Sequence, residues 1–259
     1  MVFVIDNVKL SICILSFYFY IYKYMKKKMK HIDIFSSVSE YETAKSGGTL
    51  ITPNVSFVDE DSSVRYLLKL DFTHNGYEYV DLGLPSGLKW ATCNVGATSP
   101  EEYGLYFAWG ETTGYTAEQV TSGEKLFDNE NYTASWISSD LISDQDAAHV
   151  NLGGNWRMPT KDEYQELIDN CNVEWTTNYN QTGVAGQVFT SKVNGNSVFF
   201  PAAGFCNYLF VETIGSGGQY WSASFDESST VWYFGFYSNH PIVSNNERYI
   251  GQSVRGVFK

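Results

Sequence analysis

Apolar and polar residues alternate over short stretches along most of this chain, and turn-forming residues separate the stretches. Alternation with a period of two places every second side chain on one face of an extended strand, so it predicts half-buried β-strands. The strands are expected at residues 49–52, 54–58, 66–72, 77–82, 88–93, 105–109, 187–193, 197–200, 220–224, 231–237 and 253–258. The pattern therefore indicates a chain rich in short strands.

Two Asn-Gly pairs lie between predicted strands and indicate tight hairpins. The first pair is Asn75 and Gly76, and the second is Asn194 and Gly195. Asn-Gly favours a two-residue type I′ turn, because both central positions of that turn need a positive φ. Each pair therefore predicts a hairpin between the strands that flank it.

One helix is predicted by its start signal and by its apolar face. Thr160 suits the N-cap, and Glu163 three residues later completes a capping box. Apolar residues at helical spacing follow at Tyr164, Leu167, Ile168 and Cys171. Weaker helical turns are expected at residues 99–102 and 143–149. Many short strands, one good helix and long loops together predict an α+β fold.

We expect three regions along the chain: residues 1–30, residues 31–76 as a polar linker or small β adaptor, and residues 77–259 as the main domain. The first region holds an uncharged apolar run of thirteen residues, shorter than the roughly 20 that a membrane-spanning helix needs, followed by a basic flank. Either residues 8–24 are a membrane anchor, or the region is translated upstream sequence and the start lies at Met25 or Met29. We favour the false start, because the run fits neither the length rule nor the flank rule.

The composition is that of a folded protein, with 43% hydrophobic, 17% aromatic and 18% charged residues. The formal net charge is −12, from 17 Lys and Arg against 29 Asp and Glu. Six of the 17 bases lie in the first 30 residues, so the rest of the chain is the more acidic part. An acidic surface repels phosphate backbones, which argues against a nucleic-acid partner.

The sequence contains no motif for a metal, a cofactor or a catalytic set. Its four His residues form no H-E-x-x-H motif, and the chain lacks a P-loop, a G-x-S-x-G elbow and a G-x-G-x-x-G loop. We therefore expect no metal, no cofactor and no catalytic residues. The neighbouring acids Glu101 and Glu102 are expected to be solvated, as neighbours on a chain rarely face one substrate atom.

Several other residues are more simply explained by structure than by chemistry. Arg157 is expected to fix the fold by pairing with an acid such as Asp146, and Arg255 to fix an apolar strand. Asp140, Asp144 and Asp146 alternate, but the glycine and the closing Glu of an EF-hand are missing. The cysteines are expected to be buried free thiols, with one disulfide among the last three left open: Cys13, Cys93, Cys171 and Cys206.

Six blocks of this sequence resemble the Fibrobacter succinogenes major paralogous domain family. They are YVDLGLPSGLKWATCNVGA (79–97), YFAWGET (106–112), DAAHVNLGGNWRMPTKDEYQELI (146–168), NGNSVFFPAAG (194–204), GGQYWSAS (217–224) and RYIGQSVRGV (248–257). The resemblance implies a C-type lectin-like fold for residues 77–259, with twisted antiparallel sheets, one or two flanking helices and long loops. The third block is also similar to formylglycine-generating enzymes. Those enzymes need a redox cysteine pair late in the chain, whereas no Cys follows Cys206 here.

The C-terminal block YWSAS…FGFYS…NNERYIGQSVR resembles the variable region of proteins that retroelements diversify, in which the lectin-like fold displays variable side chains on one binding face. Tyr, Trp, Ser, Asn and Asp are also the residues that antibody paratopes use. The candidate binding residues are Asp226, Glu227, Trp232, Tyr233, Tyr237, Asn239, His240, Asn245, Asn246 and Tyr249. All of these except Asp226 and Glu227 are expected to be largely exposed, with Phe234, Phe236 and Val254 buried beneath them. The alternative is an ordinary aromatic-rich sheet.

These patterns favour a non-enzymatic module that binds a protein or a glycan outside the cell, at the cell surface or on a phage-like particle. Two other functions stay open: a degenerate enzyme of the oxidase-related fold, and a structural subunit of a surface or phage-like assembly. The oligomeric state is left open.

Overall fold

The computed structural model describes residues 2–5, 55–60, 63–69, 73–227, 229–238 and 240–259, and the chain divides into two compact units, Met1–Phe72 and Thr73–Lys259. The predicted strand at 49–52 and the apolar run at 10–22 lie outside the described residues. Among the described residues, no helix is both long and apolar enough to cross a membrane.

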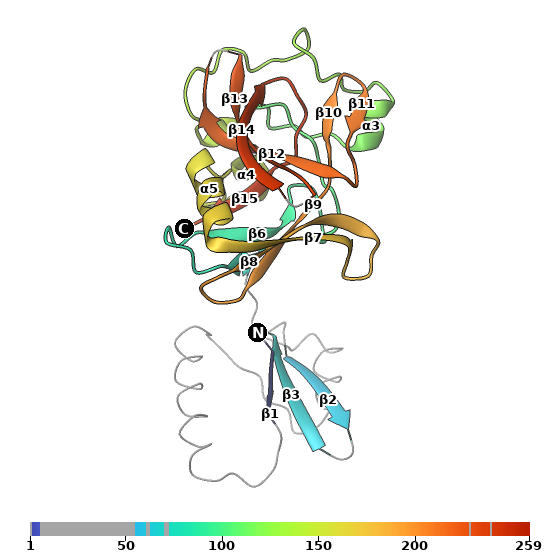
Figure 1. Ribbon diagram of the computed structural model, residues 1–259, viewed down its shortest axis with the longest axis vertical. Helices are drawn as coiled ribbons and strands as arrows, with labels where there is room; N and C mark the ends of the chain where they lie inside the picture. Colours follow the sequence, from blue (N-terminus) through green and yellow to red (C-terminus); the bar gives the residue numbers. More distant parts are fainter. Residues whose placement is uncertain (1, 6–54, 61–62, 70–72, 228, 239) are drawn as a thin grey trace. The chain divides into compact units, whose positions relative to one another are not determined.

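The first unit contains a three-stranded antiparallel sheet in the order β1-β3-β2 (Figure 1). Its strands are β1 (Val2–Ile5), β2 (Val55–Glu60) and β3 (Ser63–Lys69). β3 pairs antiparallel with both neighbours. Residues 66–69 of the strand predicted at 66–72 therefore belong to this sheet, and residues 70–72 lie outside the described residues.

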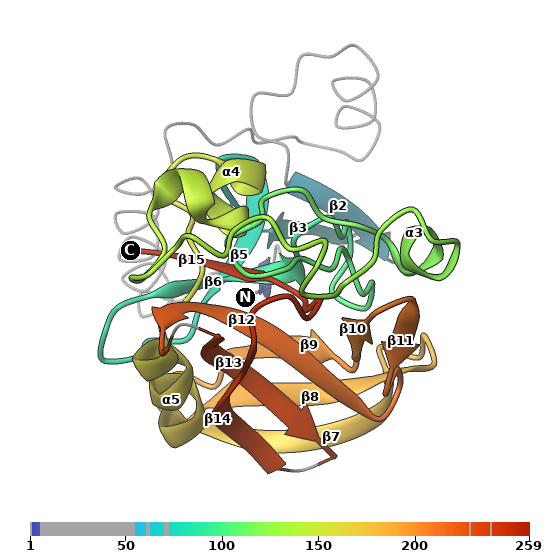
Figure 2. The ribbon, with the colours of Figure 1, turned by 90° about the horizontal axis from the view of Figure 1, so that it is seen from above.

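The second unit is built from four antiparallel sheets in its described residues, with few helices (Figures 1 and 2). The sheet β15-β6-β5-β4 contains β4 (Thr73–His74), β5 (Tyr77–Asp81), β6 (Lys89–Asn94) and β15 (Arg255–Phe258). The other sheets contain β7 (Cys171–Tyr179), β8 (Val184–Ser191) and β9 (Ser197–Pro201); β10 (Phe205–Asn207) and β11 (Phe210–Glu212); and β12 (Gly217–Phe225), β13 (Thr230–Tyr237) and β14 (His240–Glu247). This arrangement confirms the α+β class.

Three α-helices and one 3₁₀ turn lie within the described residues. They are α3 (Ala117–Thr121), η1 (Ser143–Gln145), α4 (Ala147–Leu152) and α5 (Lys161–Asn170). The helical signal at 143–149 is thus divided between η1 and α4, and the one at 99–102 forms only a turn. The sequence pattern missed α3, whose five residues hold one buried side chain, Val120, because so short a helix leaves no apolar periodicity.

The two Asn-Gly pairs have different outcomes. Asn75 (φ 50°) and Gly76 (φ 84°) form the predicted turn with positive φ at both positions, joining β4 to β5. Around Gly195 the hairpin of β8 and β9 forms, but the loop is longer than two residues, and Asn194 has no positive φ. The predicted strand at 105–109 makes only isolated bridges, from Tyr106 and Phe107, because their partners Tyr115 and Gln252 belong to no strand.

Helix α5 begins as predicted and packs against both the β7–β9 and the β12–β14 sheets (Figure 2). The Thr160 hydroxyl accepts the backbone N–H of Glu163, and the Glu163 side chain accepts the backbone N–H of Thr160, which completes the capping box. Tyr164 and Leu167 are fully buried, and the Tyr164 ring stacks on Phe234 with 4.8 Å between centroids. The helix therefore joins the two sheets through one shared aromatic core.

The prediction that Arg157 pairs with an acid is confirmed, but the acid is Glu163 and not Asp146, which was named as an example. Arg157 donates to both carboxylate oxygens of Glu163, at 2.7 and 2.5 Å. The buried carboxylate of Asp146 instead accepts three backbone N–H groups, two at the start of α4 and one from Met158. The Asp146 carboxylate thus holds the backbone at the start of α4, and the acid that meets Arg157 is Glu163 in the first turn of α5.

Arg255 fixes the fold as predicted. Its side chain is fully buried on β15 and donates to the carbonyls of Ala91, Thr92 and Phe199 and to the side-chain oxygen of Asn94. These bonds link β15 to β6 and β9, because each accepting group lies on or beside one of those strands. At the other end of the same sheet, the ring of His74 stacks on Phe258 at 4.1 Å, so the first and last strands of the unit touch.

Strand β13 is buried on both faces. Val231 and Tyr233 lie in the core cluster that contains Trp221, whereas Phe234 and Phe236 lie in the cluster that contains Tyr164. Alternate residues of a strand point to opposite faces, so Trp232, Phe234 and Phe236 share one side and Val231, Tyr233 and Tyr237 share the other. A single exposed face with a single buried layer beneath it is therefore absent along most of this strand.

Substitutions of the neighbours Phe236 and Tyr237 test which side chains of β13 are buried. Phe236→Ala should lower the free energy of unfolding by about 3–5 kcal/mol, because the ring is fully buried. Tyr237→Ala should change it by only about 0.5 kcal/mol, since that side chain is 46% exposed. Urea denaturation of both variants measures the difference, and equal losses would contradict the assignment of the two faces.

A pH dependence follows from the contact between Arg157 and Glu163. Burial alone would raise the pKa of Glu163, but the hydrogen bonds from Arg157 and Thr160 outweigh it and hold the pKa below its usual value. A carboxyl with a lowered folded-state pKa stabilises the fold above its unfolded pKa, about 4.3, and loses this contribution as the pH falls through the folded-state pKa.

Glu163→Gln keeps a capping side chain but removes the charge. We expect it to cost about 1 kcal/mol near neutral pH, because Arg157 is partly exposed to solvent, and to cost progressively less below about pH 4. Chemical denaturation at several pH values measures the difference. Glu174→Gln, at an exposed position of β7, is the control. A cost for Glu163→Gln that stays constant with pH would be evidence against the charged contact.

Candidate functional site

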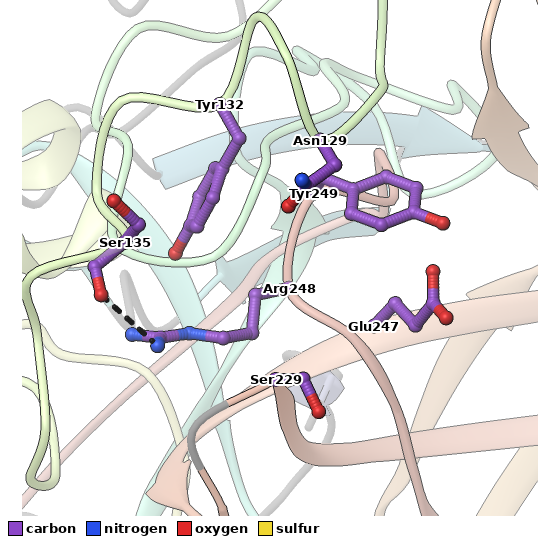
Figure 3. A pocket seen from close by; sticks show the side chains of 7 residues that line it. All are labelled: Asn129, Tyr132, Ser135, Ser229, Glu247, Arg248 and Tyr249. Carbon is purple, nitrogen blue, oxygen red and sulfur yellow. Dashed lines mark hydrogen bonds between the residues drawn. The ribbon is translucent and has the colours of Figure 1, made fainter.

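A pocket of about 330 Å³ lies between the loop that follows α3 and the turn that follows β14 (Figure 3). Residues of the loop lie on one side of it, and residues of the C-terminal part lie on the other. Its lining residues are Asn129, Tyr132, Ser135, Ser229, Glu247, Arg248 and Tyr249. The pocket therefore joins two segments that lie about a hundred residues apart in the chain.

Arg248 is the buried anchor of this pocket, with only 3% of its surface exposed. Its guanidinium donates to the backbone carbonyls of Ala134, Ser135 and Ile137. The same group lies over the rings of Trp109, Tyr132 and Phe225, at 5.1, 5.8 and 5.6 Å from the centroids. Backbone carbonyls and aromatic faces together compensate a buried cation, so Arg248 fixes the loop to the core.

Further hydrogen bonds fix the loop at Tyr132 and Thr133 to the segment that contains Trp109 and Glu111. The Tyr132 hydroxyl donates to the Trp109 carbonyl at 2.7 Å, and burial raises the pKa of this phenol to about 12. Glu111 accepts from the backbone N–H and the hydroxyl of Thr133 and forms an ion pair with Lys125 at 2.8 Å. The pocket wall is thus set by several independent bonds.

The start of the loop is a turn closed by a carboxylate. Asp128 accepts the backbone N–H and the side-chain amide of Asn131, and these hydrogen bonds lower the pKa of Asp128. Asn129 lies inside this turn with its side chain exposed. Its amide is therefore presented by a backbone that is already fixed.

The structure separates the ten candidate binding residues instead of gathering them on one face. Tyr249, half-buried, lines the pocket. Tyr233 is only 9% exposed, so the expectation that it belongs to an exposed face is wrong, because its ring lies in the core beside Trp221. The separation follows from β13 having a core on each side.

A second group of candidates lies beside the start of α5. Trp232 is half-buried, and the Lys161 ammonium lies 4.4 Å from the centroid of its ring. Asp226 accepts from Asn245 at 2.9 Å and from the hydroxyl of Thr230 at 3.1 Å. This group is a polar and aromatic surface patch tied together by its own contacts.

The remaining candidates fall elsewhere. Tyr237 and His240 are exposed and pair across the end of the β13–β14 hairpin, and Asn239 lies outside the described residues. Asn246 donates to Gln219 at 3.2 Å. Glu227 is exposed near the turn between β12 and β13.

Four residues of the loop were missed by the sequence analysis. Asn129, Tyr132 and Ser135 line the pocket, and Trp136, the next residue, is 68% exposed. The sequence did hold a signal for this loop, because NENYTASW (129–136) contains Asn, Tyr, Ser and Trp, the residue types that marked the C-terminal block. That the two segments meet could not be seen without Arg248, which joins them across more than a hundred residues.

The described residues contain no cluster of metal ligands, and their cysteines are free thiols. No three His, Cys, Asp or Glu residues there could hold a metal ion together. Cys93, Cys171 and Cys206 are free thiols, and burial raises the pKa of each, that of Cys171 to about 11. A raised pKa disfavours the thiolate, which is the nucleophilic form.

No protein-family model matches the chain, and no curated protein or solved structure is significantly similar to it. The geometry of the pocket and its surroundings is therefore the basis for any functional conclusion.

Arg248→Met tests the anchoring of the pocket wall. It removes the buried donors to the backbone carbonyls of Ala134, Ser135 and Ile137, so we expect it to lower the free energy of unfolding by about 3–5 kcal/mol and to speed amide exchange at residues 134–137. Lys89→Met, which removes the partly exposed ion pair with Asp81, should cost less than about 1 kcal/mol. Urea denaturation and hydrogen exchange compare the two, and equal costs would refute the anchoring role.

Proposed function

We propose that this protein is a non-enzymatic binding module of C-type lectin-like fold that recognises a protein or a glycan outside the cell. The observation that carries the proposal is the pocket formed by Ser229, Glu247 and Tyr249 with the anchored loop. These three residues belong to the C-terminal segment that resembles the binding region of retroelement-diversified proteins.

The local chemistry supports binding more than catalysis. The pocket combines two tyrosine rings with amide, hydroxyl and carboxylate groups, which suits an aromatic anchor with polar contacts around it. Its walls are fixed before any ligand arrives, so little ordering of the loop is needed on binding. Rigid sites of this kind bind without large rearrangement.

Features of the second unit are in keeping with the implied fold. It has antiparallel sheets, a helix α5 that packs on two of them, and a long region between β6 and α5 with few regular elements. The Tyr237–His240 end of the hairpin and the Trp232 patch then offer further exposed side chains for a large ligand. We therefore place the main contact at the pocket and secondary contacts on these two surfaces.

Binding by the full chain to an array of glycans and of secreted and surface proteins tests the proposal. Wild-type protein should bind at least one feature, and Tyr249→Ala should weaken that binding about thirtyfold, as loss of a central tyrosine costs about 2 kcal/mol. Tyr77→Ala removes a more exposed tyrosine, on β5 and outside the pocket, and should leave binding unchanged. An array without any bound feature, or binding that survives Tyr249→Ala, would count against the proposed site.

A further inference from the structure

The side chains that line the pocket are almost all hydrogen-bonding groups. Asn129, Ser135 and Ser229 contribute an amide and two hydroxyls, and none of the lining side chains is aliphatic. An apolar ligand would cover these groups without replacing their hydrogen bonds to water, which costs free energy for each group left unpaired. A ligand that donates and accepts hydrogen bonds and also has an apolar face therefore fits the pocket better than a purely apolar one.

The charges in the pocket favour a ligand without net charge. Arg248 supplies one positive charge and Glu247 one negative charge, and the other lining residues are uncharged. The guanidinium already donates to three backbone carbonyls, including that of Ser135. The lining therefore carries no net charge, and the Arg248 guanidinium is already engaged by backbone carbonyls, so the pocket selects neither an anion nor a cation.

The volume of the pocket and its aromatic side chain Tyr249 further restrict the class of ligand that fits. A volume of about 330 Å³ is at the lower end of the roughly 300–1,000 Å³ typical of small-molecule sites. Tyr249 is half-buried and lines one side of the pocket, across from Ser135 in Figure 3. A ring of this kind packs against an apolar C–H surface, whereas the rest of the pocket requires hydroxyls.

We infer that the pocket binds one neutral sugar ring, with its hydroxyls at Asn129, Ser229 and Glu247 and its C–H face against Tyr249. A sugar meets all the conditions above, because each hydroxyl both donates and accepts, the ring is uncharged, and one face is apolar. This inference rests on the proposed function and selects a glycan over a protein as its ligand.

Three sugars that share one ring but differ in charge test the inference: methyl glucoside, glucuronic acid and glucosamine. Saturation-transfer NMR with the full chain measures their binding, and methyl galactoside and methyl N-acetylglucosaminide extend the neutral set. At least one neutral glycoside should give transfer, and the two charged sugars should give less transfer than that glycoside. Stronger transfer to either charged sugar would overturn the inference.

Two matched pairs of variants locate the site. Ser229→Phe fills the pocket from an exposed turn and should abolish the transfer, whereas Ser122→Phe, at the exposed end of α3, should leave it intact. Asn129→Ala removes an exposed lining amide and should weaken binding about tenfold, whereas Asn172→Ala on β7 should not. The second pair keeps the test decisive if Ser229→Phe does not fold. Transfer that persists in both pocket variants would overturn the inference.

Failure of the inference can be told apart from failure of the proposed function. Suppose that no neutral glycoside binds, but the wild-type chain binds a protein on the array and Tyr249→Ala abolishes that binding. The sugar inference is then wrong, whereas the proposed function as a binding module is supported. If neither glycosides nor array features bind, both are wrong.

Discussion

The candidate site depends on one buried cation that replaces regular secondary structure. The loop before η1 has no strand partner at residues 134–137, so some of its carbonyl groups are satisfied by donors from elsewhere in the chain. The Arg248 guanidinium supplies them while Trp109, Tyr132 and Phe225 cover its faces. This contact joins the two walls of the pocket directly, in addition to the bonds that hold the loop to Trp109 and Glu111. Arg255 plays the same part for β6, β9 and β15, which lie at the centre of the unit.

Strand β13 sets the limit on how much of the C-terminal segment can meet a ligand. It lies between two aromatic clusters, so most of its side chains stabilise the fold and only its ends are available. Tyr237 at one end and the turn with Ser229 at the other are separated by the length of the strand. Ligand contacts must therefore come from the ends of the sheet and from the loops beside them, which is where protein scaffolds usually carry function.

Local signals in the sequence predicted local structure well. The capping box of α5 and the turn at Asn75 and Gly76 depend on a few neighbouring residues, and both formed as expected. The burial of Tyr233 could not be predicted, because alternation tells which residues share a face but not whether both faces are covered. The partner of Arg157 and the meeting of Ser135 with Arg248 depend on contacts between distant segments, and one sequence carries no record of these.

The contact between His74 and Phe258 has a consequence for how the second unit can be combined with other domains. The first and last strands, β4 and β15, form the two edges of one sheet, but the stack of His74 on Phe258 brings the two ends of the unit close together. A unit of this kind can be inserted into a surface loop of a host protein with little loss of chain entropy, since the host loop need only open by the width of a few strands. The same geometry permits new termini to be cut elsewhere after the old ones are joined, as in circular permutation.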